Sequence, residues 1–156
     1  DGGDHFGDQV RYFNSSVGLT IDMVDTSNNT GFAAGDTYVN IERLYATNFD
    51  DVIRLAADVN LQDARQGNDD ITDGAGLEYM KGGTGADTFR FVAGDGETDR
   101  VTDFALGEDL LDLTAWGVTD FGELTIATSG DDLIVSYGVE SLQLDGVTTV
   151  TDEILT

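Results

Sequence analysis

Residues 46–90 decide the fold, because they divide into nonapeptides that share one pattern. In order, the units are ATNFDDVIR (46–54), LAADVNLQD (55–63), ARQGNDDIT (64–72), DGAGLEYMK (73–81) and GGTGADTFR (82–90). The sixth position of each unit carries a side-chain oxygen: Asp51, Asn60, Asp69, Glu78 and Asp87. The eighth position is apolar in all but one unit: Ile53, Gln62, Ile71, Met80 and Phe89. Units that keep one phase in this way predict a repeat architecture.

Each unit is expected to fold as a turn followed by a short strand. Glycines at the second and fourth positions allow positive φ and let the backbone pass close to an ion. The last three residues form a strand whose middle side chain points into the core, because strand side chains alternate between faces. Two units make one coil, so turns on the same side of the molecule lie 18 residues apart.

This spacing brings oxygen atoms of different coils together. Asp51, Asp69 and Asp87 fall on one side of the coils, and Asn60 and Glu78 fall on the other. The turns direct backbone carbonyl oxygens inward, and the carboxylates add negative charge. Ca²⁺ takes about six to eight oxygen ligands at roughly 2.3–2.6 Å, which one turn cannot supply but two stacked turns can.

The composition favours one acidic domain that binds cations. The chain has 156 residues, of which 40% are hydrophobic, enough for a single domain with its own core. It has 31 acidic residues against 7 basic ones, a formal net charge of −24. A chain of this charge repels phosphate backbones and anionic lipids, so nucleic-acid binding is not expected. Multivalent cations are its natural counter-charge.

Other classes are disfavoured by what the sequence lacks. It contains no cysteine to form disulfides, and no apolar run approaches the roughly twenty residues of a membrane helix. No N-terminal signal peptide is visible, and the chain opens at Asp1 without methionine, so it is expected to be part of a larger protein. Turns must be built without proline, and the 20 glycines fit that role.

Residues 1–45 are expected to form one enlarged, irregular coil at the end of the array. The start fits the repeat template, with Asp8 at the sixth position and Val10 at the eighth. Val17, Leu19, Ile21 and Met23 then alternate with small or polar residues, which predicts a half-buried strand. Residues 38–44 predict a second strand leading into the repeats.

Residues 91–156 are expected to form a C-terminal antiparallel β cap, since the register of nine breaks after Arg90. A solenoid needs such an atypical end to close its core. A strand is predicted around residues 110–113. Later alternating runs lie at Leu124–Ala127, Leu133–Tyr137, Ser141–Leu144 and Thr148–Val150, and turn residues at Ser129–Asp132 and Asp145–Gly146 predict hairpins between them.

The nonapeptides are unequal. The unit LAADVNLQD has no glycine and places Gln62 at the inward position, so its turn is not expected to hold a cation. Arg65 replaces the second-position glycine in ARQGNDDIT, and Glu78 replaces the aspartate in DGAGLEYMK. Only GGTGADTFR keeps every feature of the pattern.

These units resemble the RTX (repeats-in-toxin) modules of Gram-negative secreted proteins, whose nonapeptide is G-G-x-G-x-D-x-U-x, with U a large apolar residue. GGTGADTFRF (82–91) followed by DRVTDFALGEDLLDLT (99–114) is similar to a junction in serralysin-type metalloproteases and in the R-modules of mannuronan epimerases. GDTYVNIERLYATNFDD (35–51) is similar to a segment that precedes the repeats in large RTX proteins. The resemblance implies an all-β, right-handed parallel β-roll, a β-solenoid of nonapeptide repeats.

The resemblance also implies how calcium would be held. In the family, stacked turns share each ion through carbonyls of the glycine-rich positions and both sixth-position carboxylates. The best pair here is ARQGND with GGTGAD, which contributes Asp69 and Asp87 with Arg65, Gly67, Gly82, Thr84 and Gly85. Further candidates for several calcium ions are Asp51, Gly74, Gly76 and Glu78 in the array and Asp99, Asp103 and Asp109 in the acidic segment after it.

A supporting role is expected rather than catalysis. His5 is the single histidine, so no HExxH zinc motif and no histidine-activated serine is present. Residues 95–99 resemble the start of an EF-hand loop but lack its closing glutamate.

The resemblance implies a structural and secretion module that folds on calcium after type I export, outside a Gram-negative cell and attached to a larger protein. A second hypothesis is a module of an adhesin or surface layer that binds a polysaccharide, a protein or another copy across the roll face. A carbohydrate-active enzyme is the least favoured alternative, since paired carboxylates alone do not distinguish a glycosidase from calcium ligands.

Overall fold

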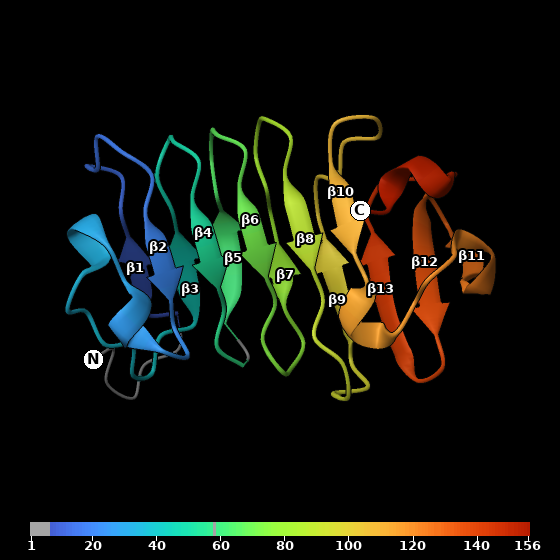
Figure 1. The fold of residues 1–156 in the computed structure, drawn as a ribbon, viewed down its shortest axis with the longest axis horizontal. Coiled ribbons are helices and arrows are strands. Elements are labelled where there is room, and N and C mark those ends of the chain that lie inside the picture. Colours follow the sequence, from blue (N-terminus) through green and yellow to red (C-terminus); the bar gives the residue numbers. More distant parts are fainter. Residues whose placement is uncertain (1–6, 58) are drawn as a thin grey trace.

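The computed structural model describes residues 7–57 and 59–156, and these fold into short strands and turns (Figure 1). The strands are β1 (Gln9–Arg11), β2 (Thr20–Asp22), β3 (Arg43–Tyr45), β4 (Val52–Arg54), β5 (Asn60–Asp63), β6 (Asp70–Thr72), β7 (Tyr79–Met80), β8 (Thr88–Arg90), β9 (Thr98–Val101), β10 (Leu110–Asp112), β11 (Thr125–Ser129), β12 (Asp132–Tyr137) and β13 (Glu140–Leu144). Single 3-10 turns are η1 (Thr26–Asn28), η2 (Gly31–Ala33), η3 (Thr114–Trp116), η4 (Phe121–Glu123) and η5 (Asp152–Ile154). Within the described ranges there is no α-helix and no helix able to cross a membrane, and the all-β class is confirmed.

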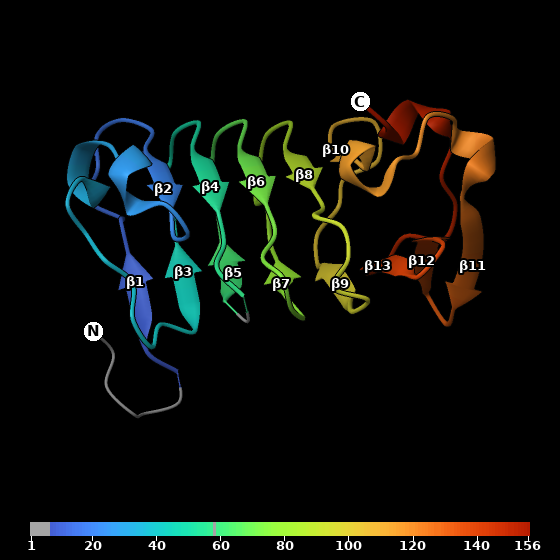
Figure 2. The ribbon, with the colours of Figure 1, turned by 60° about the horizontal axis from the view of Figure 1, so that its bottom comes forward.

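The strands form two sheets that run side by side along the molecule (Figures 1 and 2). The eight-stranded sheet has the order β1-β3-β5-β7-β9-β13-β12-β11, and the five-stranded sheet has the order β10-β8-β6-β4-β2. From β1 to β10 the chain alternates between the sheets, and neighbouring strands within each sheet are parallel. The predicted parallel β-roll, with two units in each coil, is therefore confirmed.

Inward-facing side chains form a ladder that holds the coils together. Ile53 pairs in register with Ile71, which pairs with Phe89, and all three side chains are fully buried. These residues are 18 positions apart, as the repeat predicts. Burial of each such side chain contributes about 1.5–3 kcal/mol, so the ladder supplies much of the free energy that stacks one coil on the next.

The second unit departs from its predicted register. Gln62 was predicted to point inward, but Leu61 is the buried residue, with 1% of its surface exposed, and it pairs with Leu44 and Met80. The ladder between β3 and β5 shifts by one residue after Leu44 to accommodate Gln62. Burying a leucine is favourable, whereas burying an unpartnered amide costs free energy, so apolar burial overrides the spacing of nine.

The N-terminal segment extends the roll by one irregular coil, since β1 pairs with β3 and β2 pairs with β4. Three of the four residues predicted to face inward are buried, namely Leu19, Ile21 and Met23. Val17 is 58% exposed, and that prediction was wrong: the preceding chain packs at Gly18 against the Asp50 carbonyl, and the strand begins only at Thr20. The strand predicted at 38–44 is reduced to β3. Residues 1–6, including His5, lie outside the described part of the chain.

Parallel pairing continues beyond Arg90. β9 pairs with β7 and β10 pairs with β8, and Leu111 extends the inward ladder next to Phe89. Longer loops between these strands break the period of nine without ending the coil. The parallel part of the five-stranded sheet therefore reaches Asp112, past the predicted end of the array at Arg90.

The C-terminal hairpins close one end of the roll. β11 and β12 are antiparallel around Gly130, as predicted, but the second hairpin turns at Gly138 rather than at Asp145–Gly146. The segment after β13 leaves the sheet, and residues 148–150 form no strand. The reason is tertiary: β13 pairs in parallel with β9, which fixes its direction and places Asp145–Gly146 at its exit.

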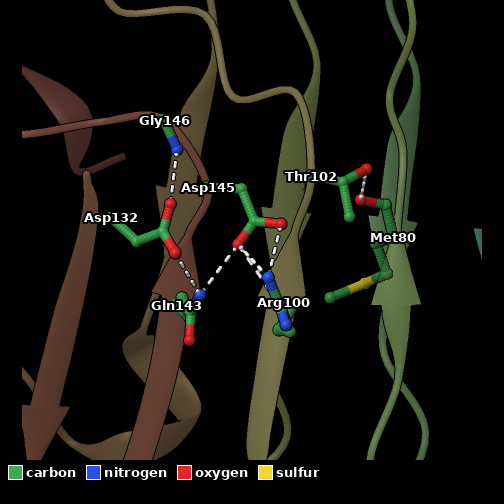
Figure 3. A network of polar contacts seen from close by, with 7 residues as sticks. All are labelled: Met80, Arg100, Thr102, Asp132, Gln143, Asp145 and Gly146. Carbon is green, nitrogen blue, oxygen red and sulfur yellow. Dashed lines mark hydrogen bonds and ion pairs between the residues drawn. The ribbon is translucent and has the colours of Figure 1, made fainter. Parts of the chain in front are cut away.

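Polar contacts fix the joint between β9 and β13 (Figure 3). Arg100 on β9 donates to both carboxylate oxygens of Asp145, each at 2.8 Å. Gln143 bridges that carboxylate to Asp132, at 3.0 and 2.8 Å, and the backbone amide of Gly146 donates to Asp132. Partly exposed ion pairs stabilise a fold only slightly, so this network ties β9 to the hairpins without supplying most of their stability.

Candidate metal sites

One row of turns holds a ladder of buried aspartates. Asp51, Asp69, Asp87 and Asp109 each precede a strand of the five-stranded sheet, and each has 4% or less of its surface exposed. The backbone amide of Asp51 donates to Oδ1 of Asp69 at 2.8 Å, that of Asp69 to Oδ1 of Asp87 at 2.9 Å, and that of Asp87 to Oδ1 of Asp109 at 3.0 Å. We call these turns the Asp69 row. Its geometry brings the predicted sixth-position acids onto one line.

The acids in the middle of the row differ from those at its ends in the hydrogen bonding of their second carboxylate oxygen, Oδ2. Oδ2 of Asp51 accepts the amide of Thr47, and Oδ2 of Asp109 accepts the amide of Ala105, each at 2.8 Å. Oδ2 of Asp69 and Oδ2 of Asp87 are buried, and neither has a hydrogen-bond partner among the described residues. A buried acceptor left unpaired costs about 1–3 kcal/mol, and more if it is charged. A bound cation would satisfy both atoms, and they belong to the two acids of the predicted best pair.

The turns that carry this pair stack backbone on backbone. The amide of Thr84 donates to the carbonyl of Arg65 at 2.8 Å, and the amide of Gly67 donates to the carbonyl of Thr84 at 3.1 Å. A Cβ atom at Gly85 would overlap the carbonyl of Gly67, and one at Gly82 would overlap the Asp87 carboxylate. Glycine is required at Gly85, where the backbone of the next turn occupies the space of a side chain, whereas at Gly82 the Asp87 carboxylate would have to move.

Arg65 takes the backbone conformation of the glycine that it replaces. Its φ is +88°, and Gly83, at the same position of the intact unit, has φ +102°. The guanidinium lies 4.4 Å from the ring centroid of Phe13, a stacking contact that offsets part of the backbone strain. The Arg65 carbonyl thus remains at the predicted place in the turn.

Substitutions at Arg65 should separate these two effects. Arg65→Ala keeps the strained φ and loses the ring contact, so it is expected to lower stability by about 1 kcal/mol. Arg65→Gly also loses the contact but removes the strain, so its stability should stay close to that of the unmodified chain. Thermal unfolding in saturating calcium measures both variants, and equal stability of the two would contradict this explanation.

Two acids that follow the repeats accept hydrogen bonds from backbone amides in the turn of the neighbouring coil. Asp103 accepts the amides of Gly82 and Gly83, one on each carboxylate oxygen, both at 2.9 Å. Asp109 accepts the amides of Asp87 and Ala105, as described above. Their place beside the intact turn agrees with the predicted set, but all four of these oxygens are engaged by backbone amides. Their role as calcium ligands stays a prediction.

The opposite row of turns holds a second group of acids. Glu78 and Asp99 are buried, and the amide of Glu78 donates to Oδ1 of Asp99 at 2.9 Å. Gly74 packs against the backbone of Ala56, where a Cβ atom would overlap the Ala56 carbonyl, and Gly76 lies in the bend that follows. Asn60 differs, since its side-chain oxygen accepts the amide of Tyr79 at 2.8 Å.

Two acids of this second group were missed by the sequence analysis. Asp73, Asp95 and Asp99 each place a carboxylate oxygen within 4.8 Å of the others, and Asp73 and Asp99 are buried. Asp73 occupies the first position of its unit, where the pattern expects glycine, and Asp95 lies in an irregular loop. A signal was present, because the sequence 95–99 is dense in acids, but only the fold places it beside Asp73.

Burial dominates the electrostatics of both rows. Desolvation, followed by neighbouring carboxylates, raises the pKa of Asp69 and of Asp73 to about 8. Burial also raises the pKa of Asp87 and of Asp99 to about 6. The pKa values of Asp51, Asp103 and Asp109 are raised by burial as well. So many buried acids require protons or cations to balance them.

Acidification is therefore expected to stabilise the calcium-free chain. A carboxyl group whose pKa is raised in the folded state binds its proton more tightly there than in the unfolded state, where the pKa is near 3.8. Its contribution favours folding at low pH and is lost as the pH rises through about 6 for Asp87 and about 8 for Asp69.

With a chelator present, the folded fraction, measured by far-ultraviolet circular dichroism, should rise as the pH falls from about 8 to about 5. The same pH series is repeated with added salt. Salt screens repulsion between exposed charges more than the effect of burial, so the part of the pH dependence that remains in salt reports on the buried acids. A folded fraction that does not depend on pH would contradict the assignment of these buried acids.

Fold and site together define a parallel β-roll of nonapeptide repeats with buried, oxygen-rich turns, the class that the similarity to RTX modules predicts. No family model and no curated protein matches the chain. Among solved structures, the chain is similar to the extracellular lipase LipA from Serratia marcescens, with 23% identity and a TM-score of 0.42 over 71% of this chain and 20% of the lipase. It is also similar to the AlgE6R3 subunit of the Azotobacter vinelandii mannuronan C5-epimerase, with 22% identity and a TM-score of 0.46 over 73% of this chain and 71% of that subunit. The chain thus spans a fifth of the lipase.

Proposed function

We propose that this chain is a calcium-binding structural module of a larger extracellular protein, which folds when it meets calcium after export by a type I system. The observation that carries the proposal is the pair of buried, unpartnered Oδ2 atoms of Asp69 and Asp87 in stacked turns. Export, the parent protein and a Gram-negative source rest on the RTX resemblance alone. The proposed role is supporting rather than catalytic.

The donor set favours calcium over other metals. The Asp69 row offers carboxylate and backbone carbonyl oxygens, the ligands preferred by Ca²⁺ and Mg²⁺, and the chain has no cysteine to bind softer metals. Magnesium requires near-octahedral geometry at about 2.0–2.1 Å and keeps several of its waters, whereas calcium accepts irregular sets of about six to eight oxygens. Two turns of unequal sequence fit the less demanding ion.

Calcium is expected to fold the chain where magnesium does not. Titration of the chelator-treated protein, followed by far-ultraviolet circular dichroism and by the fluorescence of Trp116, should show a cooperative transition. Extracellular calcium modules bind in the range of about 10⁻⁴–10⁻³ M, which sets the expected midpoint. Equal folding in millimolar magnesium, or a fold unaffected by removal of all divalent cations, would refute the proposal.

A second candidate function is binding of a polysaccharide across the outer face of the eight-stranded sheet. Four of the chain's seven basic residues lie in or directly after strands of this sheet, two of them paired with aspartates: Arg11, Arg43, Lys81 and Arg100. Tyr79, 38% exposed, lies among them with the Arg100 guanidinium 5.4 Å from its ring centroid. A hollow of about 330 Å³ beside it is lined by Arg43, Asn60, Tyr79, Lys81 and Thr102.

A glycan array with the calcium-loaded protein tests this candidate. Selective, saturable binding that Tyr79→Ala abolishes would support it, because an exposed aromatic ring with polar neighbours is a common sugar platform. Leu106→Ala, at a 52% exposed residue in the loop before β10, is the matched control and should bind unchanged. An array without selective binding would leave the structural role as the function of the module.

A further inference from the structure

We propose a further divalent-cation site, outside the nonapeptide pattern, in which Asp73, Asp95 and Asp99 bind one calcium ion at the junction between the roll and the C-terminal hairpins. The proposal rests on the proposed function only in taking calcium as the ion. None of its three acids belongs to the Asp69 row, and neither Asp73 nor Asp95 stands at the sixth position of a repeat.

The three carboxylates come from separate segments of the fold. Asp73 directly follows β6, Asp95 lies in the loop 91–97, and Asp99 is the second residue of β9. One carboxylate oxygen of each lies within 4.8 Å of the other two. Two oxygens on opposite sides of a calcium ion are about 4.6–5.2 Å apart, twice the ligand distance, so this spacing suits three ligands around one ion.

An unpartnered buried oxygen provides independent support. Only 1% of the surface of Asp73 is exposed; its Oδ1 accepts the amide of Val92 at 2.7 Å, and its Oδ2 has no hydrogen-bond partner among the described residues. Oδ2 of Asp95 is likewise buried without a partner, while its Oδ1 accepts the amide of Glu97 at 3.2 Å. Both side chains therefore have one oxygen fixed by the backbone and one left for a ligand.

The charge of the cluster points to a cation rather than to a neutral ligand. The carboxylates of Asp99, Glu78 and Asp95 all lie close enough to act electrostatically on the buried side chain of Asp73. None of the chain's basic groups is among the main causes acting on Asp73. A divalent ion would remove this repulsion, and loop carbonyls and water complete a calcium shell of about six to eight oxygens.

The position of the cluster gives the site a distinct role. The loop that carries Asp95 is tied to the hairpins, because the amide of Gly94 donates to Glu140 at 2.8 Å. The next residues after the loop form β9, which pairs with β13 and whose Thr98 hydroxyl lies 2.6 Å from that of Ser141. An ion held by Asp73, Asp95 and Asp99 therefore joins the start of the fourth unit, DGAGLEYMK, to the surface on which the hairpins dock. Calcium at this site would order the cap.

Trp116 offers a spectroscopic probe close to this site. It is the only tryptophan; its indole N–H donates to the carbonyl of Val92 at 2.8 Å, and the amide of the same Val92 donates to Asp73. Tb³⁺, which binds to calcium sites, emits strongly when a nearby tryptophan transfers its excitation energy. Tb³⁺ should therefore give tryptophan-sensitised luminescence when added to the folded, calcium-loaded protein.

The decisive variants are Asp95→Asn and Asp73→Asn, which keep the shape of the side chain and its accepted backbone amide. Each should weaken the sensitised Tb³⁺ binding by about 10- to 100-fold, since one charged ligand is lost. Glu97→Gln is the matched control: it makes the same charge change in the same loop, at an exposed residue outside the cluster, and should bind Tb³⁺ as the unmodified chain does. Hydrogen exchange should show loss of calcium-dependent protection in β13 for Asp95→Asn and not for Glu97→Gln.

The possible results are distinct. Unchanged Tb³⁺ affinity in both variants, or a calcium-folded chain without sensitised luminescence, would overturn this site and leave calcium binding in the Asp69 row intact. A chain that binds no calcium at all would overturn the proposed function as well. Asp95 lies in a loop at half burial, so a folded Asp95→Asn protein is expected even where Asp73→Asn folds poorly.

Discussion

Gly85→Ala should unfold at a much lower urea concentration than the unmodified chain. Gly85 has φ +125°, a conformation that costs a residue with a side chain about 1–3 kcal/mol. A Cβ atom there would also overlap the Gly67 carbonyl, a backbone atom of the stacked turn that cannot rotate away. We expect a total loss of about 3 kcal/mol or more, a large part of the 5–15 kcal/mol that is typical of a domain.

Gly107→Ala is the matched control for that variant. Gly107 also has a positive φ, +82°, but no atom lies within 4 Å of the place where its Cβ would stand. It should lose only about 1 kcal/mol, the effect of backbone strain alone. Urea unfolding of both variants in saturating calcium measures the difference. Similar losses would show that close stacking of the turns is not what requires glycine at Gly85.

The period of nine correctly predicts the centre of the roll because each unit there places one apolar side chain in the same inward position. Ile53, Ile71 and Phe89 must all point inward if the coils are to share a core, and the structure places them in register. The same spacing brings Asp69 and Asp87 to one row. Where the units are regular, the sequence alone therefore predicts both the ladder and the line of acids.

Irregular units were predicted less well, for a physical reason. A shift of one residue exchanges the inward and outward faces of a strand, and at Leu61 and Gln62 the burial of leucine decides the register against the spacing. Asp73 and Asp95 are 22 residues apart and meet only because a loop of irregular length folds back over the preceding turn. Spacing rules describe stacked units of equal length, so they do not reach this contact.

The hairpin turns illustrate a further limit of local patterns. Gly138 and Gly146 both have a positive φ, and each stands in a segment suited to a turn. Only Gly138 connects two antiparallel strands, because β13 is committed to parallel pairing with β9. The pairing of β13 with β9 is a long-range contact, so the sequence around either glycine does not reveal it.

Loss of one carboxylate in the Asp69 row should change stability in opposite directions with and without calcium. Asp69→Asn and Asp87→Asn keep the oxygen that accepts a backbone amide and remove the charge on the unpartnered Oδ2. In calcium, each variant should need about tenfold more of the ion to fold, the equivalent of about 1.4 kcal/mol. In a chelator, each should be more stable than the unmodified chain at neutral pH, because burial penalises the charged form of both acids.

The double variant tests whether the two acids share one ion. If they do, either single substitution damages the same site, and the double variant should shift the calcium midpoint by less than the sum of the two single shifts. Asp131→Asn, at an exposed acid in the turn between β11 and β12, makes the same charge change and should leave the midpoint in place. Calcium titrations followed by circular dichroism compare the four variants with the unmodified chain. Two additive shifts would mean that Asp69 and Asp87 hold separate ions, whereas unchanged midpoints would mean that neither carboxylate binds calcium.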